Sequence, residues 1–341
     1  MRIVVTGGAG FLGSHLCEAL LDRGDFVVCV DNLCTGEYRN IEPMIERTGF
    51  TFIQSDVSAA LDVPGSVDAV AHLASPAAPP DYHRLPLETL AVGSRGTENC
   101  LRFATRHDAR FVLASTSEIY GDPLEHPQRE TYWGNVNSIG PRSVYDEAKR
   151  FAESLTMAYG RTAGVNVGVI RIFNTYGPRM RANDGRVVSS FIVQALNGDP
   201  LTIYGDGLQT RSFCYVDDLV RGLVAMLDSA EAGPINLGNP REYTVRELAE
   251  LVLRITGSTS GIEYHPLPTD DPTRRRPDIN RAGALLGWRP EADVVEGVAR
   301  TVDYFRAQMS EVEAAKTDLA GAQFEGNPVR DVSLKPVVWP G

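Results

Sequence analysis

Short apolar runs rich in β-branched residues recur through the first half of the chain and alternate with longer helical patterns. The runs are almost continuously apolar, which is typical of strands buried on both faces of a parallel sheet. The helical segments between them suit the crossover connections that parallel strands require. The pattern predicts an α/β domain with a doubly wound parallel sheet, whose strands are Ile3 to Thr6, Phe26 to Val30, Phe52 to Gln54, Ala69 to Leu73, Phe111 to Ala114 and Val165 to Ile170.

The pattern of the second half is less regular. We expect helices from about Val187 and from about Asp217, with a short strand, Leu201 to Tyr204, between them. A further helix should begin after Thr244, because this residue suits an N-cap and Glu247 stands at the third position of a capping box. These elements predict a smaller, substrate-binding α/β domain.

Three parts of the chain follow from these patterns. Residues 1–178 should form the doubly wound domain, and residues 179–310 mainly the smaller domain, some segments of which could rejoin the first sheet. Residues 311–341 have low hydrophobicity and predict a polar tail outside the core. Within the second part, Pro266 to Pro277 combines prolines with charges and matches neither period, so it predicts a loop.

Composition narrows the classes of partner. The net charge of −11 argues against nucleic acid or an anionic membrane as the main partner. Five cysteines without a CxxC pair do not form a disulfide framework, so we expect them reduced and mostly buried. The chain starts directly with a strand-like run, and no apolar stretch reaches the roughly 20 residues that span a bilayer. We therefore expect a cytoplasmic protein, and we predict no metal site.

A glycine-rich turn follows the first strand. Gly7, Gly10 and Gly13 stand between that strand and an amphipathic helix, in the spacing that opens Rossmann dinucleotide-binding units. Glycines there allow a tight turn and let backbone N–H groups approach a pyrophosphate. The next strand ends in Asp31, 18 residues after Gly13. A carboxylate at that position accepts hydrogen bonds from a ribose 2′-hydroxyl and repels a 2′-phosphate, so the predicted cofactor is NAD rather than NADP.

A candidate catalytic group lies further along the chain. Tyr145 and Lys149 are four residues apart, which places them on one face of a helix. A free tyrosine has a pKa of about 10, and a nearby ammonium favours its phenolate, which is a usable base. Thr116 stands upstream at the end of a predicted strand, where its hydroxyl could hold the same substrate oxygen.

With these residues the chain resembles the extended short-chain dehydrogenase/reductase family. Within that family it is most similar to the UDP-glucuronate decarboxylases, and the similarity runs from the N-terminus to about residue 305. The strings that carry it lie at residues 72–77, 113–121, 132–134, 140–142, 171–179, 184–188, 209–216 and 271–278.

The resemblance implies a cycle in which carbon 4 of UDP-glucuronate is oxidised with NAD, carbon dioxide leaves, and carbon 4 is reduced again to give UDP-xylose. Tyr145 would remove the 4-hydroxyl proton, and Lys149 would lower the pKa of Tyr145 and hold the nicotinamide ribose. Thr116 would hold the 4-oxygen. Ser117 and Glu118 would lie near carbons 5 and 6 and manage water or proton delivery. NAD should then be tightly bound and recycled.

The resemblance also implies further site residues. Arg275, in a cluster with Arg274 and Arg276, is assigned to the sugar end and completes the catalytic set. The remaining cofactor residues would be Phe11, Leu12, Asn32, Asp56, Val57, Leu73, Ser75 and Ala114, beside Gly7, Gly10, Gly13, Asp31, Tyr145 and Lys149. The UDP-sugar substrate would contact Tyr82, Asn174, Arg186, Ser189, Tyr204, Gln209, Arg211 and Arg275. The apolar faces of helices around residues 84–106 and 143–160 would form a homodimer interface.

One stretch departs from the family pattern. Family members tend to carry a lysine where this chain has Ala91, although Arg95 stands one helical turn further on and could compensate. If that lysine steadies the bound sugar, its loss should weaken retention of the intermediate. We hypothesise that some UDP-4-keto-pentose is therefore released.

Two other functions stay open on the sequence. A UDP-glucuronate 4-epimerase would use the same first step but keep the carboxylate, and Ser117, Glu118 and Arg275 speak against it. A non-enzymatic sensor of NAD or nucleotide sugars is disfavoured because Thr116, Tyr145 and Lys149 are all retained.

Overall fold

A computed structural model describes residues 1–267 and 274–324. Its largest sheet has seven parallel strands in the order β11-β6-β5-β4-β1-β2-β3. The bounds of these strands are β1 (Arg2–Thr6), β2 (Phe26–Asp31), β3 (Phe50–Gln54), β4 (Ala69–His72), β5 (Arg110–Thr116), β6 (Val167–Ile172) and β11 (Ile235–Leu237). All six predicted strands are present, and a seventh is added from the second half of the chain. The predicted fold class is confirmed.

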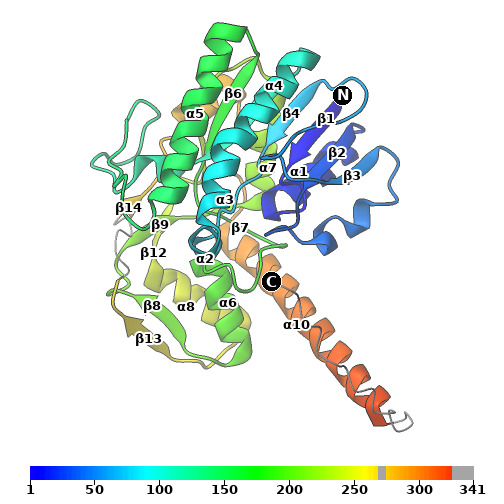
Figure 1. The fold of residues 1–341 in the computed structure, drawn as a ribbon. Coiled ribbons are helices and arrows are strands. Elements are labelled where there is room, and N and C mark those ends of the chain that lie inside the picture. The colour runs from blue at the N-terminus through cyan, green and yellow to red at the C-terminus, as the bar shows by residue number, and fades with distance from the viewer. Residues whose placement is uncertain (268–273, 325–341) are drawn as a thin grey trace, which may run out of the picture.

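Helices cover both faces of this sheet (Figure 1). Helices α1 (Phe11–Asp22) and α7 (Val216–Asp228) lie on one face, whereas α3 (Pro86–Ala91), α4 (Thr97–His107) and α5 (Ser143–Ala163) lie on the other. Successive strand residues point to opposite faces, so Ile3 belongs to one buried cluster and Val4 to the other. The nearly continuous apolar strands follow from this double burial.

A smaller group of elements lies beside the sheet, as the sequence predicts. Helices α6 (Val187–Asn197), α8 (Val245–Thr256) and α10 (Val294–Phe324) contact one another, and β8 (Leu201–Tyr204) pairs with β13 (Ile262–His265). The capping box of α8 is confirmed, because Thr244 Oγ1 accepts from Glu247 N at 3.0 Å and Glu247 Oε2 accepts from Thr244 N at 2.7 Å. The remaining short elements are α2 (Pro79–Arg84), α9 (Asn280–Leu286), β7 (Thr175–Tyr176), β9 (Thr210–Ser212), β10 (Cys214–Tyr215), β12 (Glu242–Thr244) and the 3₁₀ turns Tyr38–Asn40, Glu42–Met44 and Ser117–Tyr120.

Two segments differ from the sequence-based expectation. The predicted loop Pro266 to Pro277 contains a strand, β14 (Arg274–Arg275), because β9 offers it an edge for pairing; residues 268–273 lie outside the described residues. Helix α10 continues to Phe324, into the predicted tail 311–341 (Figure 1). The chain between 301 and 320 contains neither glycine nor proline, so its polarity does not end the helix. Residues 325–341 lie outside the described residues.

Two further features bear on the expectations from composition. Among the described residues, no helix combines the length and the apolarity that crossing a bilayer would require. All five cysteines are free, and four of them are buried, which confirms the expected cysteine state; Cys34 is exposed.

Candidate active site

A cleft of about 250 Å³ opens where the parallel strands of the large sheet end. Parallel strands present their carboxyl ends at one edge, so residues far apart in the sequence meet there. Of the predicted cofactor residues, all line this cleft: Gly7, Gly10, Phe11, Leu12, Gly13, Asp31, Asn32, Asp56, Val57, Leu73, Ser75, Ala114, Tyr145 and Lys149. Of the predicted catalytic and substrate residues, Thr116, Ser117, Glu118, Asn174 and Arg186 line it too.

The glycine turn between β1 and α1 leaves no room for side chains. A Cβ on Gly13 would lie 2.0 Å from the carbonyl oxygen of Gly7, and a Cβ on Gly7 would lie 2.7 Å from the amide nitrogen of Ala74. Gly7 also has a φ of +71°, which favours glycine. Gly10 N-caps α1 without a side-chain cap, so the first N–H groups of the helix remain available. The turn therefore has the close backbone approach and the donors that a pyrophosphate requires.

Asp31 closes the turn at the end of β2. Its carboxylate accepts hydrogen bonds from Ala9 N at 3.0 Å and Leu33 N at 2.8 Å, and its side chain is buried. Burial raises the pKa of Asp31, whereas the two backbone hydrogen bonds oppose that rise. A buried acid beside a glycine cradle fits the ribose of NAD, as the sequence predicts.

Tyr145 and Lys149 lie on α5 and face Thr116 at the end of β5. Lys149 Nζ donates to Ala114 O at 2.9 Å and lies 5.9 Å from the centre of the Tyr145 ring. Burial lowers the pKa of Lys149 to about 8. Burial also raises the pKa of Tyr145, against a hydrogen bond with Thr116 that lowers it. Tyr145 is thus a weaker acid in this structure than the Tyr–Lys spacing alone suggests. The ring of Tyr82 stacks on the ring of Tyr145, with the two centroids 5.3 Å apart, and shields it from water.

Glu118 lies on the 3₁₀ turn after Thr116 and is held by two arginines. Arg275 donates to both carboxylate oxygens at 2.5 and 2.7 Å, and Arg142 donates to one of them at 2.8 Å. Although burial would raise the pKa of Glu118, the two guanidinium groups outweigh it and lower the pKa to about 2. Glu118 is therefore a fixed carboxylate.

Two residues near this cluster carry no role in the sequence-based prediction. Arg142 occurs in the quoted string 140–142, but no spacing rule connects it with Glu118. Asp146, next to Tyr145, is buried, and its Oδ1 has no hydrogen-bond partner within residues 1–267 and 274–324; burial together with the charge of Glu118 raises its pKa to about 7. The helical period could have placed Asp146 beside Arg142, yet its burial depends on the tertiary packing.

Other predicted residues are not among those that line the cleft. Tyr204 is half exposed. Gln209 Nε2 donates to the carbonyl oxygen of Tyr204 at 2.6 Å, so these two residues lie together in the smaller domain. Arg211 lies beside Arg275 in the pairing of β9 with β14. Ser189 Oγ donates to Asp184, which does line the cleft.

The segment that departs from the family pattern lies next to the cleft. Glu88 and Val92 line it, whereas neither Ala91 nor Arg95 is among the described lining residues. Arg95 is exposed to solvent, which does not support the expectation that it replaces a cation at the site.

The doubly wound sheet, the glycine cradle and the Thr–Tyr–Lys group define a dinucleotide-dependent oxidoreductase of the short-chain type. The chain belongs to the NAD dependent epimerase/dehydratase family, whose model matches residues 3–238. This membership confirms the predicted family and the predicted NAD cofactor.

Curated relatives are similar over most of the chain. UDP-glucuronic acid decarboxylase 1 of Arabidopsis thaliana is 51% identical over 93% of this chain and 72% of that protein. UDP-glucuronic acid decarboxylase 1 of Danio rerio is 52% identical over 90% of this chain and 73% of that protein. At about half identity over nine-tenths of the chain, the similarity includes both sides of the cleft.

Solved structures share the fold at lower identity. UDP-glucuronic acid 4-epimerase from Bacillus cereus, in complex with UDP-glucuronic acid and NAD, has a TM-score of 0.81 at 29% identity over 90% of this chain and all of that one. The dTDP-glucose 4,6-dehydratase DesIV from Streptomyces venezuelae, with NAD bound, has a TM-score of 0.82 at 29% identity over 90% of this chain and 97% of that one.

Proposed function

We propose that this protein converts UDP-glucuronate into UDP-xylose and carbon dioxide, with NAD as a retained cofactor. The observation that carries the proposal is the meeting of two groups at one turn. Thr116 faces Tyr145 and Lys149, and Glu118, two residues on, holds Arg275 and Arg142. The relatives named UDP-glucuronic acid decarboxylase support it at 51–52% identity, whereas the epimerase structure is 29% identical.

The first group suits proton transfer at carbon 4. Tyr145 would take the 4-hydroxyl proton, and Thr116 would hold the 4-oxygen. Lys149 would contact the nicotinamide ribose and keep positive charge near the phenolate, since its amine is cationic below its pKa of about 8. Bound NAD supplies a reversible hydride acceptor for carbon 4.

The second group suits a hexuronate carboxylate. Arg275 and Arg142 both pair with Glu118, and a guanidinium is a planar donor that can also bind a carboxylate in bidentate fashion. Once carbon 4 is a ketone, the bond from carbon 5 to the carboxylate can break, because its electrons flow into the carbonyl. We assign the subsequent proton delivery at carbon 5 to Ser117, since both oxygens of Glu118 are engaged by arginines and its pKa is about 2. This narrows the shared role that the sequence-based prediction gives to Ser117 and Glu118.

The remaining residues would hold the two nucleotides. Gly7, Gly10 and Gly13 would receive the pyrophosphate of NAD, and Asp31 its ribose. The hydride taken from carbon 4 returns to the sugar, so NAD should stay bound through turnover. The UDP-sugar would extend from Tyr82, Asn174 and Arg186 toward the smaller domain, where Ser189, Tyr204, Gln209 and Arg211 are the proposed contacts.

The test is incubation of the purified protein with UDP-glucuronate and without added NAD, following carbon dioxide and the sugar product together. We expect equal amounts of carbon dioxide and UDP-pentose, mainly UDP-xylose. A product that retains its carboxylate would instead identify a UDP-glucuronate 4-epimerase, the alternative that the Bacillus cereus structure favours. A non-enzymatic sensor would keep its full cellular effect in a Tyr145→Phe variant.

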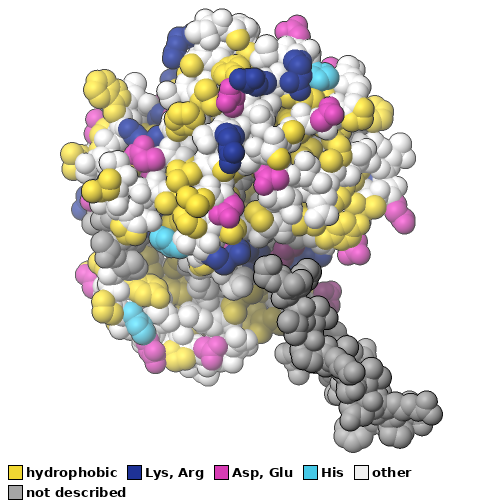
Figure 2. All heavy atoms as spheres, viewed as in Figure 1, with side chains coloured by type: hydrophobic (Ala, Val, Ile, Leu, Met, Phe, Trp, Pro, Cys, Tyr) yellow, Lys and Arg dark blue, Asp and Glu magenta, His cyan; other side chains and the backbone are white. Residues whose placement is uncertain are grey.

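We further propose a homodimer and a cytoplasmic location. Large apolar side chains are exposed on the contacting helices α3 and α5, with Leu87 74% and Phe151 52% exposed. Figure 2 shows hydrophobic side chains among charged ones on the face where these helices lie in Figure 1. Light scattering should give twice the chain mass, and a Leu87→Glu, Phe151→Glu double variant should give the monomer. The free cysteines suit a reducing compartment, which cell fractionation tests.

A further inference from the structure

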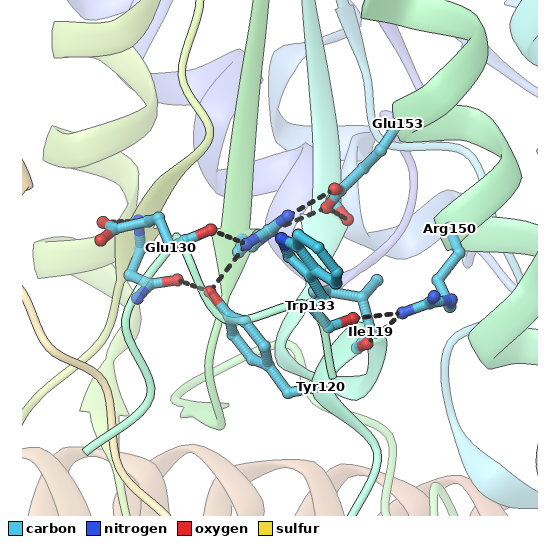
Figure 3. Close-up of polar contacts among 9 residues, drawn as sticks. Ile119, Tyr120, Glu130, Trp133, Arg150 and Glu153 are labelled. Atoms are coloured by element: carbon cyan, nitrogen blue, oxygen red, sulfur yellow. Dashed lines mark hydrogen bonds and ion pairs between the residues drawn. The ribbon is translucent and has the colours of Figure 1, made fainter. Parts of the chain in front are cut away.

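A chain of buried polar side chains lies behind the turn that carries Glu118, and none of its members is among the described residues that line the NAD cleft. This network of hydrogen bonds runs from α5 across β6 to the turn and on to Gln128, and Figure 3 shows its part between Glu153 and Tyr120. Its members are Glu153, Arg171, Tyr120, Asn236 and Gln128.

The chain begins at an ion pair between α5 and β6. Arg171 donates to the two carboxylate oxygens of Glu153 at 3.0 and 2.8 Å, and Ser115 Oγ donates to the same carboxylate at 2.5 Å. Arg171 Nη1 also donates to Glu130 O at 2.9 Å. The guanidinium is buried, and Glu153 raises the pKa of Arg171, so the pair stays charged. The ion pair thus joins three elements of the large domain, α5, β5 and β6, and the loop that carries Glu130.

Tyr120 carries the connection onward from this ion pair. Its hydroxyl accepts from Arg171 Nη1 at 2.9 Å and donates to Asn236 Oδ1 at 2.8 Å. Asn236 Nδ2 in turn donates to the backbone oxygens of Gln128 at 3.0 Å and Asp278 at 3.1 Å. Tyr120, Asn236 and Gln128 are all almost completely buried. A buried hydrogen-bond network is rigid and keeps a single geometry when each of its polar groups has a hydrogen-bond partner.

Two members of this network, Tyr120 and Gln128, lie close to the Glu118–Arg275 pair. Tyr120 ends the 3₁₀ turn only two residues after Glu118. Gln128 accepts from Arg276 N at 2.8 Å through Oε1, and its own N–H donates to Arg276 O at 2.9 Å, so it fixes the residue next to Arg275. Glu118 and Arg275 are 157 residues apart in the sequence. One hydrogen-bonded path nevertheless connects Tyr120, near Glu118, with Gln128, which binds the residue next to Arg275.

We propose that Tyr120 and Arg171 are positioning residues that align Glu118 with Arg275 for recognition and loss of the sugar carboxylate. The inference rests on the proposed decarboxylation. Among the described residues, neither Tyr120 nor Arg171 has a hydrogen bond or ring contact with Tyr145 or Lys149, although the charge of Glu153 raises the pKa of Lys149. Because removal of the Tyr120 hydroxyl leaves the Glu153–Arg171 ion pair in place, the two steps should respond differently to it. Catalytic groups must be held within about 0.5 Å of their productive geometry for full activity. The hydrogen bonds of Tyr120 and Arg171 would hold Glu118 and Arg275 in this way.

The experiment uses Tyr120→Phe in the full-length protein. This variant keeps the ring that packs between Tyr132 and Phe173 and removes only the hydroxyl between Arg171 and Asn236. Two activities are measured: carbon dioxide release from UDP-glucuronate, and reduction of UDP-4-keto-pentose by NADH, which involves no carboxylate. We expect the first to fall about tenfold to a hundredfold, because a buried acceptor loses its donor, and the second to stay within about twofold.

Tyr132→Phe is the matched control. Tyr132 stacks on Tyr120, but among the described residues its hydroxyl accepts only from Leu124 N in the loop, so both activities should be kept. Reduction of UDP-4-keto-pentose at the wild-type rate also shows that a variant is folded. If Tyr120→Phe does not fold, Arg171→Lys, which keeps the charge opposite Glu153, takes its place.

The outcomes separate the proposals. A parallel loss of both activities in a folded variant, or no loss in either, overturns the positioning role. Wild-type protein that reduces UDP-4-keto-pentose but releases no carbon dioxide from UDP-glucuronate overturns the proposed function itself, whatever the variant does.

Discussion

The two sides of the cleft differ in what holds their charged groups. On one side Lys149 has a hydrogen bond to a carbonyl oxygen, and burial lowers its pKa to about 8. On the other side burial would raise the pKa of Glu118, whose side chain is 14% exposed, but Arg275 and Arg142 keep it ionised, with a pKa of about 2. Burial alone therefore does not decide protonation; the nearest partner does. On the first side the lysine lies close to a tyrosine, whereas on the second side two arginines hold one carboxylate.

The largest expected effect comes from Tyr145→Phe on the proton-moving side. Removing a general acid–base group costs about 10²- to 10⁴-fold in rate, and both carbon dioxide release and reduction of UDP-4-keto-pentose should fall by that factor. Steady-state assays of the two reactions measure it. Tyr159→Phe, on the same helix but away from the cleft, is the control and should keep both activities. A Tyr145→Phe protein that loses only one of them would contradict the shared role at carbon 4.

Glu118→Gln tests the side of the cleft on which two arginines hold a carboxylate. Loss of one partner of a buried ion pair costs about 3–5 kcal/mol, so we expect a lower Tm at pH 7 together with a loss of carbon dioxide release. The folded-state pKa of about 2 lies below the ordinary value, so the stabilisation is complete above about pH 4.5 and is lost as the pH falls toward 2. The Tm difference between wild type and variant should therefore shrink from pH 5 to pH 3. Glu263→Gln, at an exposed site, should show no such trend.

Asp146→Asn should have a smaller effect whose size depends on pH. The pKa of Asp146 is raised to about 7, so the folded protein is favoured when this carboxyl is protonated; that stability is fully present below the ordinary pKa of 3.8 and is lost as the pH rises to about 7. Compared with wild type, the variant should gain Tm at pH 8 and change little at about pH 4. Its KM for UDP-glucuronate should also rise less above pH 7, because no negative charge appears beside the arginines.

Calorimetry at the two pH values and initial rates between pH 6 and 9 measure these effects. Asp22→Asn at the exposed end of α1 is the control. An equal Tm change at both pH values would show that Asp146 does not titrate in this range.

The smallest expected effect concerns Ala91, which lies next to the cleft rather than in it. If the missing lysine weakens retention of the intermediate, the wild-type protein should release some UDP-4-keto-pentose and accumulate an equal amount of NADH. Ala91→Lys should lower the ratio of UDP-4-keto-pentose to UDP-xylose, which NMR of the product mixture measures. A wild-type product free of keto sugar, without NADH, would refute the hypothesis.

Local patterns in the sequence predicted much of the molecule because their physical causes are local. Continuous apolar runs identified the six strands, Thr244 and Glu247 identified the start of α8, and the glycine spacing identified the turn that a Cβ would block. The interval from Tyr145 to Lys149 placed both side chains in one cleft, since it matches the helical repeat. By contrast, the low hydrophobicity after residue 310 did not predict the continuation of α10, because helix formation needs no apolar face where propensity suffices.

Only the tertiary structure decided which charges meet. Glu118 and Arg275 are 157 residues apart, and β14 brings them together by pairing with β9 in a segment without helical or strand periodicity. The same packing surrounds Glu118 with Arg142, buries Asp146 and joins Arg171 to Asn236 through Tyr120. Such contacts depend on how the elements are arranged in space, whereas the residue types and their spacing determine only which chemistry is available at each element.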